Sequence, residues 1–193
     1  MEEIMNINII VVGANQTGLV FAAFARNAGF DVTVYEAKKQ CDVAYDWTDD
    51  MVEETFEEVG MPLPPKEIYT RKRNWTFVPP EKRVNVLMDL PDDQLDMAIY
   101  RRPFNAWLLS RAECAGVKVF YETPVKRAIV ENDVVLGVEL ENGEVVPAGL
   151  VVDCGGVNSA VRKSLPESLK ITRNIDKNLS LIHISEPTRL DVI

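Results

Sequence analysis

One stretch near the start of the chain constrains the fold more than any other. It opens with an apolar, β-branched run at 8–12 and continues with the turn Gly13–Gly18. A run at 19–28 follows, with the composition of a helix, and then an apolar run at 31–35 that is followed by Glu36. The order strand, glycine-containing turn, helix, strand and acid is typical of a βαβ unit that binds a dinucleotide.

Each part of this unit has a physical role. Gly13 allows a tight turn after the first strand, and Gly18 allows the helix to pack closely on the sheet. The start of the helix, where Gln16 and Thr17 lie, offers free N–H groups and a positive dipole end to a pyrophosphate. Glu36 is placed to accept hydrogen bonds from an adenosine ribose, and its charge would repel a 2′-phosphate. The alternative is a parallel α/β unit that binds no nucleotide.

Asn15 departs from the usual motif, which has a glycine at this position. That position must let the backbone approach the pyrophosphate, and it often has an unusual φ. Asparagine tolerates the left-handed region better than most residues, but it adds bulk. We therefore expect Asn15 to be suboptimal, so that Asn15→Gly would tighten nucleotide binding by relaxing strain at positive φ.

Composition narrows the classes of function. A chain of 193 residues forms one large domain or two small ones, and it has no apolar run long enough to span a membrane. The acidic start lacks the basic region of a signal peptide, so we expect a cytoplasmic protein. The net charge of −9 argues against a nucleic-acid partner. Three widely spaced cysteines and a single histidine predict no metal site and no disulfide.

The middle of the chain mixes helices with short strands. Thr48 is expected to cap a helix that ends at Gly60, with Asp49 and Asp50 on a solvated acidic face. The segments that read as short strands are 68–70, 74–78 and 84–88, and residues 97–100 then lead into the next helix. Such inserted antiparallel strands suggest a second layer that covers a ligand. A helix from Arg101 to Ala115 follows.

The last third of the chain alternates between the sheet and a meander. A third parallel strand is predicted at 117–121 and a buried returning strand at 150–153. Three antiparallel strands, one ending at the turn Asn142-Gly143, are predicted between them at 125–131, 134–140 and 144–147. A second glycine turn at 154–158 then leads into a short helix.

Three motifs, in order, resemble FAD-dependent oxidoreductases of the para-hydroxybenzoate hydroxylase fold, which include aromatic monooxygenases and geranylgeranyl reductases. The first motif is the βαβ unit that ends at Glu36. The second, at 101–108, is similar to the family's Arg-x-x-Phe-Asp-x-x-Leu helix start, and the third, at 151–162, is similar to Val-Asp-Ala-Asp-Gly-Ala-x-Ser-x-Val-Arg. The resemblance implies an α/β fold: a Rossmann-like FAD-binding βαβ domain with inserted antiparallel strands from an incomplete substrate domain.

The resemblance also implies roles for single residues. The first motif would hold the FAD pyrophosphate and ribose, and Arg101 would reach the FAD phosphates or the ribityl region. The third motif would lie near the cofactor. The full set of predicted cofactor-binding residues is Gly13, Asn15, Gln16, Thr17, Gly18, Glu36, Ala37, Lys38, Arg101, Gly155, Gly156, Ser159 and Arg162.

Gly155 stands where the family has an acid, and this favours the reductase or dehydrogenase side of the family over the hydroxylases. No side chain is a convincing acid or base catalyst, in agreement with chemistry supplied by a flavin. We expect FAD as cofactor, NAD(P)H as reductant and a small-molecule substrate, apolar or lipid-like. The alternatives are an aromatic monooxygenase, an NAD-binding Rossmann enzyme and a protein that has lost its cofactor.

The end of the chain differs from the rest. Residues 179–189 look like the translation of a sequencing adaptor, so 179–193 is expected to be a non-native tail. Residues 1–178 would then be the FAD/NAD(P)-binding domain with interleaved strands of a truncated substrate domain, inactive alone. The alternative for 179–184 is an added strand.

Overall fold

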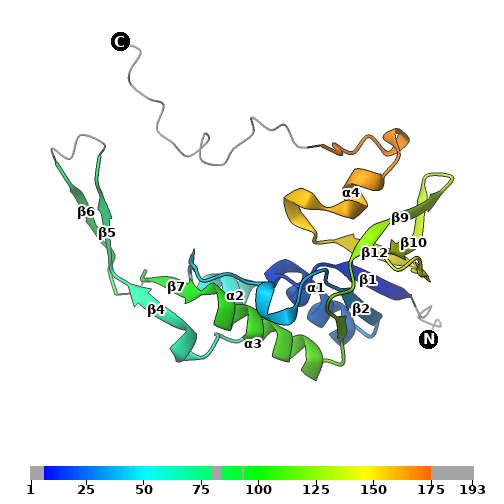
Figure 1. Cartoon of the computed structure of the whole chain (residues 1–193). Helices are drawn as coiled ribbons and strands as arrows, with labels where there is room; N and C mark the ends of the chain where they lie inside the picture. Colours follow the sequence, from blue (N-terminus) through cyan, green and yellow to red (C-terminus); the bar gives the residue numbers. More distant parts are fainter. Residues whose placement is uncertain (1–6, 80–83, 93, 175–193) are drawn as a thin grey trace, which may run out of the picture.

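A four-stranded parallel sheet organises the fold (Figure 1). The structure is a computed structural model that describes residues 7–79, 84–92 and 94–174. The sheet has the strand order β12-β1-β2-β8. Its strands are β1 (Asn8–Val12), β2 (Asp31–Tyr35), β8 (Lys118–Phe120) and β12 (Leu150–Asp153). The predicted parallel strands are confirmed, although β12 is an edge strand with Leu150 45% exposed. The predicted tail at 179–193 lies outside the described residues.

The two faces of the sheet bury two separate apolar clusters, because successive residues of a strand point to opposite faces. On one face Ile9 and Val11 pack with Leu19 of α1 (Gln16–Asn27) and Leu108 of α3 (Arg101–Cys114). On the other face Ile10 packs with the meander and with α4. The bounds of that layer are β9 (Val125–Glu131), β10 (Val134–Leu140), β11 (Val145–Pro147) and α4 (Ala160–Ser164).

The inserted strands form two further sheets. The first has the order β3-β7-β4, and the second is the hairpin β5-β6, which projects from the body in Figure 1. The bounds are β3 (Thr48–Met51), β4 (Tyr69–Lys72), β5 (Asn74–Phe77), β6 (Val86–Asp89) and β7 (Asp96–Tyr100). Short 3-10 turns lie at Gln40–Asp42, Lys66–Ile68, Gly156–Asn158 and Glu167–Leu169.

The predicted helix from Thr48 to Gly60 is wrong. Residues 48–51 form β3, which pairs antiparallel with β7, and the helix α2 is limited to Glu54–Glu58. Strand β7 carries Met97 and Ile99, both fully buried, and its central position requires a hydrogen-bonded partner on each edge. This tertiary requirement overrides the weak local helix signal at 48–51.

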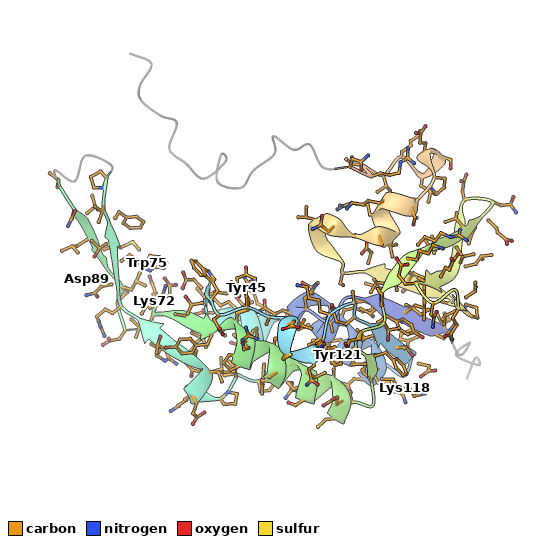
Figure 2. All side chains as sticks on the ribbon, viewed as in Figure 1. Tyr45, Lys72, Trp75, Asp89, Lys118 and Tyr121 are labelled. Carbon is orange, nitrogen blue, oxygen red and sulfur yellow. The ribbon has the colours of Figure 1, made fainter. Side chains whose placement is uncertain are left out.

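The hairpin β5-β6 concentrates exposed apolar surface. Cross-strand pairing puts Trp75 opposite Met88 and Phe77 opposite Val86, so one face of the ribbon is apolar. Trp75 and Phe77 stack, and Lys72 Nζ lies 3.9 Å from the centre of the Trp75 ring, at the base of the hairpin (Figure 2).

Among the described residues, no helix has the length and apolar character needed to cross a membrane.

Candidate dinucleotide-binding site

The turn between β1 and α1 packs too closely for side chains at two positions. Gly13 has a φ of +107°, and a Cβ atom there would lie 2.7 Å from the Cys154 carbonyl oxygen. A Cβ atom on Gly18 would lie 2.0 Å from the Gly13 carbonyl oxygen. These contacts explain why a tight turn and a close helix need glycine at both positions.

Asn15 does not have the strained backbone expected from the sequence. Its φ is −76° and its ψ is 179°, which is extended backbone, because the positive φ of the turn falls on Gly13. Asn15 caps α1: its Oδ1 accepts a hydrogen bond of 3.1 Å from the Gly18 N–H. Its Nδ2 donates to the Cys154 carbonyl oxygen at 2.6 Å and so ties the first glycine turn to the second.

Because this strain is absent, we expect Asn15→Gly to give no gain in nucleotide affinity from its relief, and we expect a loss of stability instead. Asn15→Ala should lower the free energy of unfolding by about 1 kcal/mol through loss of the cap. Asn15→Gly keeps most of the capping preference but loses the link to Cys154, so its effect should be smaller and in the same direction. Urea unfolding of both variants checks this, and a higher midpoint for Asn15→Gly would contradict it.

Glu36 is held rigidly at the end of β2. The residue is 8% exposed, and its Oε2 accepts from the Ala14 N–H and its Oε1 from the Lys38 N–H, each at 2.8 Å. Each carboxylate oxygen has a second lone pair available to a ligand hydroxyl. The sheet therefore presents a fixed acceptor pair beside the glycine turn.

Two adjoining cavities lie at the carboxyl ends of β1, β2 and β12, where open α/β sheets bind their ligands. One of about 320 Å³ is lined by Glu36 and Lys38, and one of about 420 Å³ by Arg101. They share Asn15 and Cys154 in their walls. The predicted site residues found in these walls are Gly13, Asn15, Gln16, Thr17, Glu36, Ala37, Lys38, Arg101, Gly155, Gly156 and Ser159.

Two predicted residues lie outside these cavities. Gly18 is buried against the turn, and Arg162 donates from its Nη2 to the Val157 carbonyl oxygen. Ser159, 3% exposed, caps α4 by accepting from the Arg162 N–H at 2.9 Å, and its Oγ donates to Asp153. The hydrogen bonds of Ser159 and Arg162 thus fix the second glycine turn to the end of β12 and to the start of α4.

Arg101 is the centre of a cluster that the sequence did not reveal. Asp49 of β3 accepts from Arg101 Nε at 2.8 Å and from its Nη2, and it also accepts from Gln16 Nε2 at 3.3 Å. Arg101 Nη1 donates to the Tyr45 hydroxyl at 2.6 Å, and the guanidinium lies 4.5 Å from the centre of that ring. Asp49 is therefore half-buried in an ion pair, not on a solvated helix face as predicted.

The ion pair makes stability depend on acid pH. Hydrogen bonding by Arg101 lowers the pKa of Asp49 below its ordinary value, which outweighs the opposing effect of burial. A depressed folded-state pKa contributes stability that is present above the unfolded pKa and is lost as pH falls through the folded pKa. The midpoint temperature of thermal unfolding should decrease as the pH falls below about 4. Asp49→Asn should flatten this part of the plot of midpoint temperature against pH. Thermal unfolding from pH 7 to pH 3 measures both, and an unchanged slope in the variant would contradict the assignment.

Comparisons with known proteins agree with this geometry. The model of an NAD(P)-binding Rossmann-like domain matches residues 11–57, and a model described as tryptophan halogenase matches residues 89–172. Digeranylgeranylglycerophospholipid reductase 2 of Methanopyrus kandleri is 30% identical over 172 residues, which is 86% of this chain and 42% of that protein.

Solved structures show the same fold. A geranylgeranyl bacteriochlorophyll reductase-like protein from Thermoplasma acidophilum matches with a TM-score of 0.69 at 18% identity. The match covers 82% of this chain and 41% of that protein's chain. A 2-methyl-3-hydroxypyridine-5-carboxylic acid oxygenase matches with a TM-score of 0.66 at 20% identity. The match covers 83% of this chain and 42% of that protein's chain.

These findings confirm the resemblance drawn from the motifs. The chain has the Rossmann-like core and separate antiparallel sheets of FAD-dependent oxidoreductases with the para-hydroxybenzoate hydroxylase fold. The curated relatives that the chain resembles include two lipid reductases. The chain spans 42% of the length of these two relatives.

Proposed function

We propose that the two adjoining cavities bind FAD. The adenosine ribose hydrogen bonds to Glu36, the diphosphate meets the free N–H groups at the start of α1, and the flavin end extends toward Arg101. The observation that carries this proposal is the buried Glu36 carboxylate, fixed by two backbone N–H groups beside the glycine turn. A ligand with a 2′-phosphate would place a second anion against this carboxylate.

We further propose that the chain serves a flavin-dependent reductase of an apolar small molecule, with NAD(P)H as reductant. Bound FAD supplies the hydride chemistry, and the residues of this chain bind and orient it. The relatives named as lipid reductases support the substrate class. Gly155 in place of the hydroxylase acid supports a reductase, because the carboxylate that the hydroxylases carry at this position is absent from this chain.

A second candidate function is NAD binding, which the match to the NAD(P)-binding domain model favours. Titration of the purified protein with FAD, followed by flavin fluorescence, separates the two candidates. We expect FAD to bind, ADP to displace it, and NAD to displace it only weakly. Binding of NAD without binding of FAD would replace the proposed function by the second candidate.

A further inference from the structure

The walls of the proposed site carry as many acidic as basic side chains. Among the described residues that line the two cavities, the cations are Arg101 and Lys38, and the acids are Glu36 and Asp153. Asp49, bound directly to Arg101, adds a further acid. The lining therefore presents no excess of positive charge to a ligand that carries about two negative charges.

Asp49 fixes the guanidinium while it cancels its charge. The Asp49 carboxylate accepts hydrogen bonds from Nε and Nη2 of Arg101. This bidentate geometry fixes the orientation of the guanidinium most firmly. Tyr45 takes one donor of Nη1. Arginine has five N–H donors, so one donor remains on each terminal nitrogen. Arg101 thus keeps directed donors beside the larger cavity but no uncompensated charge.

We propose that Asp49 is a positioning and specificity-determining residue: it makes the Arg101 cavity a site for a neutral, hydroxyl- or carbonyl-rich group, and not for a phosphate. This inference rests on the proposed dinucleotide site. For FAD it assigns the ribityl region to the Arg101 cavity. The diphosphate lies between the cavities, held by N–H groups at the start of α1 and not by Arg101.

A charge argument gives the sign of the expected effect. A carboxylate near a bound diphosphate opposes binding, and its removal leaves the Arg101 charge uncompensated. Asp49→Asn should therefore tighten FAD binding, by about 3- to 20-fold at low salt. If Arg101 instead contacts the phosphates directly and needs Asp49 only as a support, the same variant should bind FAD more weakly.

The experiment compares FAD affinity in the wild type, Asp49→Asn and Asp50→Asn at low and at high salt. Asp50 is a matched control, since it is the next residue of β3 and pairs with Lys72 instead of Arg101. We expect the affinity of the wild type and of the control to change little with salt. The affinity of Asp49→Asn should fall as salt rises, because its excess charge is screened.

A second variant separates the effect of charge from any disturbance of the fold. Asp49→Glu keeps the negative charge, so it should retain the weak salt dependence of the wild type even if β3 is disturbed. Weaker binding by Asp49→Asn with an unchanged salt dependence would overturn the inference while leaving the FAD site intact. A wild type that binds no FAD would instead refute the proposed function.

Discussion

Alanine at position 18 is expected to lower the free energy of unfolding by about 3 kcal/mol or more. The new methyl group would lie 2.0 Å from the Gly13 carbonyl oxygen, and a backbone atom has no rotamer by which to move away. Helix α1 would have to shift from β1, which would also disturb the packing of Leu19 and Ala22, both fully buried. Urea unfolding measures the loss, and FAD binding should disappear with it.

Gly29→Ala is the control that separates a steric cost from a backbone cost. Gly29 follows the same helix and has a φ of +96°, but a Cβ atom there would meet no heavy atom within 4 Å. Its replacement should cost only about 1–2 kcal/mol, from the left-handed backbone. Equal losses for the two variants would show that the close contact at Gly18 is not the reason for its glycine.

Glu36→Gln is expected to weaken FAD binding by about 1.5–3 kcal/mol, or roughly 10- to 150-fold. Glutamine preserves the shape and can keep one of the two backbone hydrogen bonds, but its NH2 group faces the other N–H donor, and it loses the charge that strengthens hydrogen bonds to the ribose hydroxyls. Alanine would be a less informative change, because Glu36 also accepts from the Ala14 and Lys38 N–H groups. Fluorescence titration with FAD gives the affinity.

The control for this variant lies at the other end of the same strand. Asp31 begins β2, is exposed, and has its described ionic contact with Arg26 at 3.7 Å. Asp31→Asn removes the same charge but should leave the FAD affinity within about twofold, as expected for an exposed surface charge. Unchanged FAD affinity in Glu36→Gln, with intact folding, would remove Glu36 from the site.

The sequence predicted those parts of the fold whose signals are local. The βαβ unit combines a β-branched strand, a glycine turn and a helix within thirty or so neighbouring residues, so each element constrains the next. The helix that begins at Arg101 and the meander strands were likewise predicted from their own spacing and turns.

Partners that are distant in the sequence were not predictable in the same way. Residues 48–51 become a strand only because β7 lies beside them, nearly fifty residues later in the chain. Asp49 meets Arg101 across 52 positions, and Asn15 meets Cys154 across 139. No local pattern encodes these contacts, which set the charge of the larger cavity and tie the first glycine turn to the second.

The most direct test of the dinucleotide site uses the cysteines of the chain. Cys154 is half-buried in the wall shared by both cavities, whereas Cys41 and Cys114 are exposed elsewhere. Burial raises the pKa of the Cys154 thiol, so alkylation by N-ethylmaleimide is best followed at mildly alkaline pH by mass spectrometry. We expect saturating FAD to slow the alkylation of Cys154 and to leave the rates at Cys41 and Cys114 unchanged. Alkylation of Cys154 at the same rate with and without FAD would contradict the assignment of these cavities.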